Sequence, residues 1–222
     1  MSTRSPRHLA RLAGPVAVAV LLAGCGSKTD DAAKATSPAP ASAAATQPGA
    51  PAETGHANPV DAAFVREMIP HHELAIEMAS YVRKRSSHAE VKALAQRIST
   101  TQRDEVTELK AAAKRLHVTL PAGDGMPSAA QMRVDSATLG IPSVGMGMSM
   151  DPAMLKSARP FDKAFLTDMI PHHQGAITMA RAEVVRGGDQ ELKTLAGGIA
   201  ATQNAEIIQM AKWRLAWYPA KS

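Results

Sequence analysis

The sequence is poor in cysteine and in aromatic residues, and no stretch of it alternates between apolar and polar residues with a period of two. A single cysteine, Cys25, excludes a disulfide within the chain and a site built from several thiolates. Only 3% of the residues are aromatic, and removal of the three arginines in the first 24 residues lowers the formal charge from +5 to +2. We therefore expect no sheet and no nucleic-acid partner.

The first 24 residues predict a lipoprotein signal peptide. Three arginines precede the apolar run PVAVAVLLA (15–23), which is too short to span a bilayer as a helix. The sequence LAGC (22–25) places small residues before a cysteine, as in proteins that are acylated at that position. We expect export, cleavage before Cys25, and a lipid on Cys25 that anchors the protein to a membrane on its periplasmic or cell-surface side. A metal site in the mature chain must then use histidine, methionine, carboxylate or backbone ligands.

The segment that follows the cysteine predicts a tether. Residues 25–57 are rich in alanine, proline, serine and threonine and lack apolar periodicity. The remaining residues, 58–219, are enough for one compact domain.

That domain contains an internal repeat. An offset of 101 aligns residues 59–109 with 160–210 without a gap, and 22 of the 51 aligned positions are identical. The domain is therefore built from two copies of one unit, over 58–117 and 158–219.

Each copy predicts a hairpin of two long helices. Asn58 and Pro59 supply a helix cap and a first-turn proline, and apolar residues then recur in steps of three and four through Pro70. A helix that starts only at Pro70 would have a poor cap. Residues 85–87 predict the turn, with Ser87 and Glu90 as a capping box for the second helix.

Two such hairpins predict an all-α fold, a four-helix bundle. The connection at 118–157 is rich in glycine, proline and methionine, and Ser128 with Gln131 predicts a short helix there that Gly140 ends.

A histidine doublet stands on the buried face of the first helix in each copy. The motif MIPHH occurs at 68–72 and again at 169–173, and the partner helices interrupt their apolar stripes with a glutamine and a glutamate. In a hairpin that turns near 86–87, His71 lies level with Gln102, and Met68 lies level with Glu105. Because the doublets fall near mid-helix, we expect all four histidines to meet near the bundle centre.

Two interpretations of this polar centre are open. A network of histidine, glutamate and glutamine hydrogen bonds could fix the register of the hairpins. Alternatively, the histidines bind a metal ion together with thioethers. Of the twelve methionines six lie in the connection, where GMGMSMDPAM (145–154) offers flexible soft ligands. Thioethers with imidazoles favour copper, with zinc or iron possible. The candidate metal ligands are Met68, His71, His72, Met78, Glu105, Met146, Met148, Met150, Met169, His172, His173, Met179 and Glu206.

The repeated F-x-x-x-M-I-P-H-H-x-x-A-I-x-M-A, followed by L-A-x-x-I-x-x-T-Q-x-x-E, resembles the ferritin-like family known as domain of unknown function 305 (DUF305). The resemblance covers about residues 58–217. It implies an exported, duplicated, ferritin-like four-helix bundle, and some members are linked to copper binding and tolerance. The family's marker positions fall on the two histidine doublets and on Met68, Met78, Met169 and Met179.

The hypothesis that the sequence favours is a lipid-anchored copper-binding protein that stores copper or confers tolerance. One alternative is a binding or scaffold module of the cell envelope with a structural histidine core. The other is a di-iron carboxylate enzyme, which needs two Glu-x-x-His motifs. Glu105 and Glu206 lack that histidine, and Glu67 and Asp168 are predicted to point away from the main stripe, so we expect no enzyme.

Overall fold

A computed structural model describes residues 57–219, and all the regular structure in this range is helical. The predicted signal peptide, Cys25 and the tether up to residue 56 lie outside the described residues. Between residues 57 and 219, no helix combines the length and the apolar character needed to cross a membrane.

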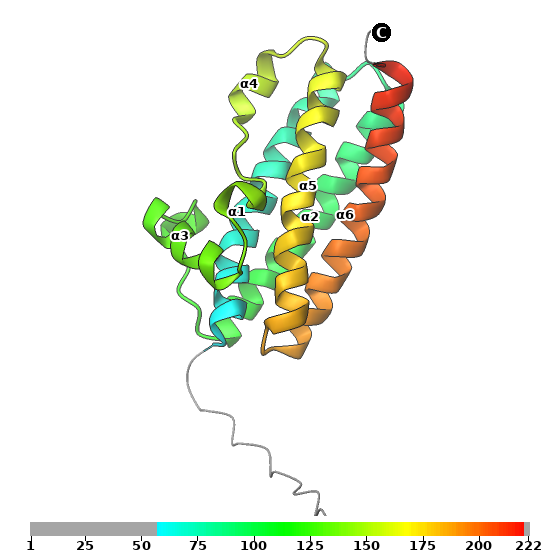
Figure 1. The fold of residues 1–222 in the computed structure, drawn as a ribbon. Coiled ribbons are helices and arrows are strands. Elements are labelled where there is room, and N and C mark those ends of the chain that lie inside the picture. The colour runs from blue at the N-terminus through cyan, green and yellow to red at the C-terminus, as the bar shows by residue number, and fades with distance from the viewer. Residues whose placement is uncertain (1–56, 220–222) are drawn as a thin grey trace, which may run out of the picture. The chain divides into compact units, whose positions relative to one another are not determined.

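Four long helices form the two predicted hairpins. The first hairpin pairs α1 (Pro59–Arg85) with α2 (Ala89–Arg115), and the second pairs α5 (Phe161–Arg186) with α6 (Gln190–Trp217). The four helices lie side by side in Figure 1, where α1 packs along α5. This arrangement confirms the predicted all-α bundle of two repeated hairpins.

The first helix of each repeat runs through its proline. The Asn58 side chain accepts a hydrogen bond from the Val60 N–H at 2.8 Å, and α1 continues past Pro70 to Arg85. Pro171 lies inside α5 in the same way. A helix that begins at Pro70 is therefore ruled out, and the histidines stand near the middle of each helix.

An aspartate at the start of each repeat fastens the turn of the other repeat. Asp61 accepts from the Gly188 N–H at 2.7 Å, and Asp162 accepts from the Ser87 N–H at 3.0 Å. Positions 61 and 162, like 87 and 188, are equivalent under the offset of 101. The two contacts therefore define an approximate twofold relation, in which α1 and α5 are antiparallel.

The predicted capping box of Ser87 and Glu90 is wrong. The residue before α2 is His88, without a side-chain cap, and the Ser87 hydroxyl donates instead to Asp162 at 2.8 Å. A capping box is a pattern of residues close in sequence, whereas the buried carboxylate of Asp162 belongs to the other hairpin.

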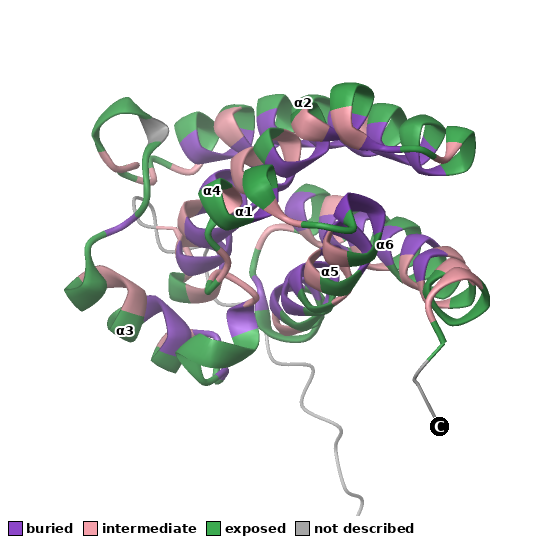
Figure 2. Cartoon of the chain, turned by 90° about the horizontal axis from the view of Figure 1, so that it is seen from above, coloured by how far each residue is buried: buried purple, intermediate pink, exposed green. Residues whose placement is uncertain are grey.

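The helices bury their inward faces in two hydrophobic clusters (Figure 2). One cluster contains Phe64, Leu109 and Ile199, and the other contains Val82, Leu94 and Phe165. Along every long helix the two clusters are separated by a short polar interval, which is the level of the candidate site.

The connection between the hairpins is folded. It contains η1 (Ala122–Asp124), α3 (Ala129–Thr138), η2 (Ser143–Met146) and α4 (Pro152–Ser157), which lie on one side of the bundle in Figure 1. Ser128 caps α3 by accepting from the Gln131 N–H at 3.1 Å, and Gly140, with φ of 62°, follows its end. The Gln131 amide bonds to Asp135 instead of completing the predicted capping box.

Two equivalent arginines hold the connection. At the end of α1, Arg85 donates to the Lys156 and Ala158 carbonyls, and at the end of α5, Arg186 donates to the Thr138 and Leu139 carbonyls. The connection is thus fastened at both hairpins.

The sequence predicts that Glu67 points away from the main stripe of its helix, but Glu67 is not exposed to solvent there. Its side chain is fully buried, because α3 covers that side of α1 and brings Asp135 to it. Burial, together with the charge of Asp135, raises the pKa of Glu67 to about 8. Glu67 is therefore largely protonated at neutral pH and can share its proton with Asp135, which also accepts from Arg66 at 3.0 Å.

Candidate metal centre

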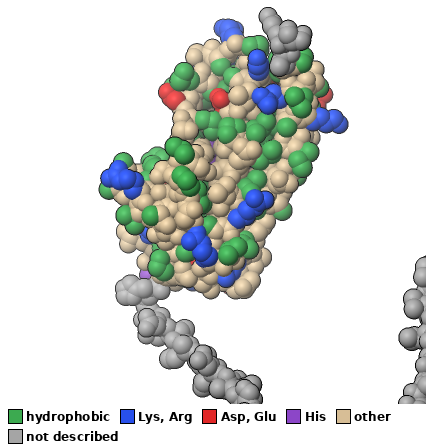
Figure 3. Space-filling model, in the orientation of Figure 1, with side chains coloured by type: hydrophobic (Ala, Val, Ile, Leu, Met, Phe, Trp, Pro, Cys, Tyr) green, Lys and Arg blue, Asp and Glu red, His purple; other side chains and the backbone are tan. Residues whose placement is uncertain are grey.

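Eight buried polar residues form a layer across the middle of the bundle, between the two hydrophobic clusters. Each long helix contributes two of them. We call this set the polar layer: His71, His72, Gln102, Glu105, His172, His173, Gln203 and Glu206. Histidine scarcely shows on the face drawn in Figure 3, and the four layer histidines are 0% exposed. The structure thus brings the two doublets together at the centre, as the repeat predicted.

The central contact of the layer is between the two repeats. The rings of His71 and His172 stack with their centroids 3.7 Å apart and their planes 18° from parallel. On either side, His72 and His173 lie 6.2 and 6.4 Å from the neighbouring ring of their own doublet. The four imidazoles therefore form one continuous group.

The outer histidines face the glutamates of the partner helices. Nε2 of His72 lies 2.8 Å from Oε2 of Glu105, and Nε2 of His173 lies 2.8 Å from Oε2 of Glu206. These pairs are related by the approximate twofold axis. The predicted level of Glu105 was therefore close but not correct, since it reaches His72 rather than standing opposite Met68.

Many polar atoms in the layer have no hydrogen-bond partner. The buried and unpaired atoms include both ring nitrogens of His71 and Nδ1 of His72 and of His173. The side-chain amides of Gln102 and Gln203 are also buried and unpaired. Leaving such atoms buried and unpaired costs free energy, typically about 1–3 kcal/mol for each. Imidazole nitrogens without a proton donor or acceptor are available as metal ligands.

His172 differs from His71. Its Nδ1 lies 3.0 Å from the Gly147 carbonyl oxygen and its Nε2 lies 3.1 Å from the His71 carbonyl oxygen. A neutral imidazole has one N–H, so it can donate to only one of these carbonyls at a time. The other nitrogen presents its lone pair to a carbonyl oxygen, an unfavourable contact that also restricts the approach of a metal ion to that nitrogen.

Electrostatics keeps the central rings neutral. The pKa of His71 is lowered well below its usual value, mainly because the ring is buried. The neighbouring His172 makes the next largest contribution, and the two outer histidines lower the pKa further. Burial, followed by His173, lowers the pKa of His172 to about 3. A neutral ring can coordinate a metal ion, whereas a protonated one cannot.

The four motif methionines flank the layer in pairs. Met68 and Met179 pack in one hydrophobic cluster, and Met78 and Met169 pack in the other. All four are at most 1% exposed. Each side of the polar layer therefore carries thioethers from both repeats.

The connection adds methionines to the same clusters. Met146 is buried and Met148 is half-buried against the cluster of Met68, while Met150 lies against the cluster of Met78. The segment is pressed against α5: a Cβ on Gly175 would lie 2.2 Å from the Met146 carbonyl oxygen. By contrast, Met126 and Met154 of the same connection are 47% and 73% exposed.

The donor set fits a soft or borderline metal ion. Among residues 57–219, no three side chains of the His, Cys, Asp and Glu types are placed to hold an ion as they stand. The rings of His71 and His172 are stacked and their lone pairs lie in nearly parallel ring planes, so a ring must turn before both can point at one ion. Neutral imidazoles and thioethers suit copper, whereas ions that prefer all-oxygen sites, such as Mg²⁺ and Ca²⁺, do not match them.

An open groove between α2 and α6 leads to the layer. It has a volume of about 670 Å³, and its lining includes Thr101, Thr202 and the carboxylate-bearing Glu206. Glu206 remains 9% exposed while it contacts the fully buried His173. The groove is therefore one place where the polar layer reaches solvent.

Sequence reasoning missed a second polar cluster at the far end of α1. His88 stacks on Trp217 with centroids 3.9 Å apart, and its Nδ1 lies 2.8 Å from Asp162. The identity of Asp61 and Asp162 in the two repeats was a usable signal, because an aspartate kept in both copies near a helix start indicates a structural partner.

A duplicated helical bundle with a buried centre of histidine and methionine is the class of protein that this fold and site define. The profile of DUF305, a domain of unknown function, matches residues 61–214. The chain belongs to the DUF305 family. A comparison with curated proteins gives no match.

Solved structures of the same family are similar over most of the described chain. CopM in its Cu(II)-bound form is 33% identical, with a TM-score of 0.59 over 71% of this chain and 97% of CopM. CopM in its Cu(I)-bound form is 30% identical, with a TM-score of 0.57 over the same shares. A DUF305 protein from Streptomyces coelicolor, described as secreted, is 30% identical, with a TM-score of 0.61 over 73% of this chain and 96% of that protein.

Proposed function

We propose that this protein is an exported copper-binding protein that holds copper at the polar layer. The observation that carries the proposal is the group of four buried histidines, neutral at the centre, with unpaired ring nitrogens and with methionines on both sides. Storage of copper or protection against it fits such a buried site better than catalysis, which needs access for a second substrate.

Related proteins support the choice of metal. Structures of CopM have been solved in Cu(I)-bound, Cu(II)-bound and silver-bound forms. Silver and Cu(I) are soft ions that prefer thioethers and imidazoles, which are the donors gathered here. We therefore propose His71, His72, His172 and His173 as the central ligands, with Met68, Met78, Met169 and Met179 as thioether donors.

Two further parts of the proposal concern the connection and the membrane. Met146, Met148 and Met150 would supply thioethers from the connection, and Glu105 and Glu206 would position the outer histidines or join the ligand set. A lipid on Cys25 would keep the protein at the envelope membrane after export.

Replacement of all four layer histidines by alanine tests the central site. In the full chain this variant should lose the tightest copper site, measured by Cu(I) competition titration and by copper content after dialysis. The copper-dependent rise of the melting temperature should disappear with it, because a ligand that binds only the folded state stabilises it. The control replaces His117, an exposed histidine outside the layer. Unchanged copper content and affinity in the fourfold variant, with a normal fold, would disprove the proposed site.

A second variant separates the layer from the connection. Replacing Met146, Met148 and Met150 with leucine conserves apolar volume but removes the thioethers. A partial loss of affinity would place these residues in the ligand set. Loss of all binding in this variant, with binding retained in the histidine variant, would move the site to the connection.

A structural function of the layer is the competing proposal, and one observation favours it. The pairs His72–Glu105 and His173–Glu206 each join the two helices of one hairpin. In that case copper, zinc and iron would all leave the melting temperature unchanged.

A further inference from the structure

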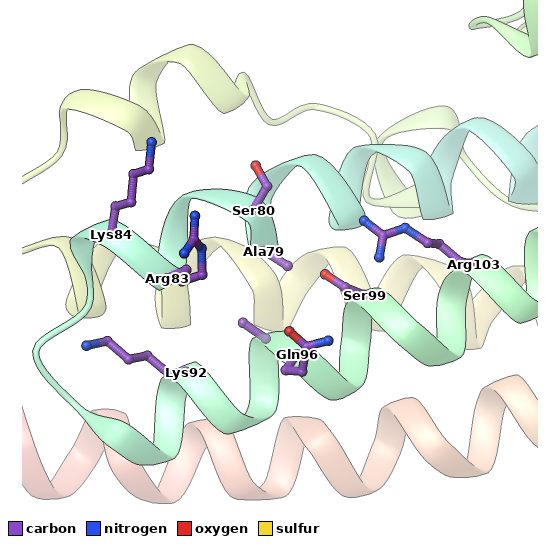
Figure 4. A pocket seen from close by; sticks show the side chains of 9 residues that line it. Ala79, Ser80, Arg83, Lys84, Lys92, Gln96, Ser99 and Arg103 are labelled. Atoms are coloured by element: carbon purple, nitrogen blue, oxygen red, sulfur yellow. The ribbon is translucent and has the colours of Figure 1, made fainter.

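A groove between α1 and α2 carries an unbalanced positive charge. It has a volume of about 550 Å³. Figure 4 shows Lys84 and Lys92 at one end of the groove and Arg103 at the other, with Arg83 also on its α1 side. The small side chains of Ala79, Ala95 and Ser99 line its floor, and no acidic residue lines it.

The four cations of this groove have no partner among the described residues. Elsewhere in residues 57–219, basic side chains form ion pairs, such as Arg115 with Asp189 and Arg66 with Asp135. No such contact involves the side chain of Arg83, Lys84, Lys92 or Arg103. Four cations held around one hollow repel one another, so the groove is a favourable place for an anion.

The second repeat provides an internal comparison. The positions equivalent to Arg83, Lys84 and Arg103 are Val184, Val185 and Asn204, which carry no charge. Lys193 matches Lys92, but the buried Glu183 lies near it. The two repeats are alike at the polar layer and differ here, so the charge is not required by the repeated fold.

We propose that the groove of Arg83, Lys84, Lys92 and Arg103 binds phosphate groups, in particular those of anionic lipid headgroups. The spread of the cations along the groove matches several phosphates on one surface better than a single small ion. Hydroxyl and amide donors of Ser80, Gln96 and Ser99 lie between the cations and can complete the contacts. This proposal is independent of the copper site.

The predicted lipid anchor makes such a surface available. Cys25 is separated from Asn58 by 32 residues. A chain of that length spans at most about 110 Å when extended, and α1, with 27 residues, is about 40 Å long. The groove, near the far end of α1, is therefore within reach of the membrane that holds the lipid.

Vesicle binding by the mature chain, residues 25–222 with Cys25→Ala, tests the proposal, because it lacks both the predicted signal peptide and the predicted acylation site. Vesicles of phosphatidylglycerol in phosphatidylcholine should sediment the protein, and vesicles of phosphatidylcholine alone should not. Replacing Arg83, Lys84, Lys92 and Arg103 with glutamine should weaken binding by up to about 600-fold, since each of the four cations near an anionic surface contributes roughly a factor of five.

A control variant with the same change in net charge separates binding in the groove from non-specific electrostatic attraction between the protein and the vesicles. It replaces four exposed cations that lie outside the groove and form no side-chain ion pair: Lys114, Arg133, Lys163 and Arg214. This variant should lose less than about threefold. A third variant, with Val184→Arg, Val185→Lys and Asn204→Arg, should gain vesicle binding by building the groove into the second repeat.

Pyrophosphate distinguishes the source of the phosphate. Competition of pyrophosphate with anionic vesicles would support headgroup binding in the groove. Binding of pyrophosphate without vesicle binding, when lost only in the groove variant, would support the phosphate site with a soluble ligand. Equal losses in the groove and control variants, or no binding of either probe, would overturn the proposal.

Discussion

The two histidine doublets have the same sequence but different surroundings. His71 stacks on His172, and neither of its ring nitrogens has a partner. The ring nitrogens of His172, in contrast, contact two backbone carbonyls, one of them from Gly147 in the connection. The connection therefore breaks the symmetry of the bundle at its centre.

A single position shows how the sequence accommodates this difference. Gly175 lies where Met146 packs on α5, with no room for a Cβ, whereas the equivalent position in α1 is the half-buried Leu74. Two copies of one unit can thus share a core while only one of them receives the connecting segment.

The largest expected effect is that of Gly175→Ala. The new methyl group would collide with the Met146 carbonyl, and overpacking against backbone should cost about 3 kcal/mol of stability. We expect a lower urea midpoint, faster proteolysis within residues 140–150 and weaker copper binding. The matched change Gly198→Ala, where a Cβ meets nothing within 4 Å, should stabilise α6 by up to about 1 kcal/mol. Equal midpoints for the two variants would show that the connection is not held against α5.

The second comparison is between two aspartates. Asp61 lies at the start of α1, and Asp162, at the start of α5, contacts the turn that follows α1. Asp61 lies beside the buried Glu183, whose pKa is raised to about 8 by burial and then by Asp61. Burial also raises the pKa of Asp162, but hydrogen bonds from Ser86, His88 and Ser87 outweigh it, so that the pKa of Asp162 is lowered overall. Glu183 therefore stabilises the fold fully below its ordinary pKa of 4.5, and this contribution is lost as the pH rises to about 8. Asp162 contributes above its ordinary pKa of 3.8, and its contribution is lost as the pH falls through its lowered pKa.

Glu183→Gln and Asp162→Asn should separate these contributions. Asp162→Asn should cost about 2 kcal/mol at neutral pH, because hydrogen bonds to a charged group are lost. In the unmodified chain, Glu183 should make the free energy of unfolding decline by at most about 1.4 kcal/mol per pH unit between about pH 4.5 and 8. Glu183→Gln should remove this decline. Urea unfolding of the metal-free chain across this range measures both. A decline as steep in Glu183→Gln as in the unmodified chain would contradict the role given to Glu183.

The smallest expected difference is between His71→Ala and His172→Ala. Copper displaces no hydrogen bond from His71, but at His172 it must compete with the Gly147 carbonyl. We expect His71→Ala to lower Cu(I) affinity about tenfold more, or about 1.4 kcal/mol. In the metal-free protein, His172→Ala should cause the larger loss of melting temperature, because it removes a hydrogen bond to the connection. Competition titration measures the affinities and thermal unfolding measures the melting temperatures. A larger affinity loss in His172→Ala, together with a larger loss of melting temperature in His71→Ala, would contradict this prediction.

The repeat made most of the fold and the centre of the site predictable. Because side chains on one helical face recur every three or four residues, the doublets and Gln102 could be placed at one level before any coordinates, whereas Glu105 was expected opposite Met68 and reaches His72 instead. The imidazole and thioether donors predicted copper, the family resemblance implied the same metal, and CopM structures have been solved in copper-bound forms.

Contacts between distant segments were not predictable. Glu67 is buried only because α3 folds over α1, and Ser87 turns away from its helix only because Asp162 approaches from the other hairpin. Periodicity describes one helix at a time, so it cannot show which segment will cover a face or which carboxylate will reach a turn.

The exchanged contacts of Asp61 and Asp162 imply that neither hairpin is complete by itself. Each aspartate belongs to one hairpin and holds the turn of the other. A shorter chain with a single copy would satisfy both only as a homodimer, which would place the stacked histidines on its dyad. In the present chain both copies lie in one polypeptide, so the connection between them can carry methionines on one side of the bundle only.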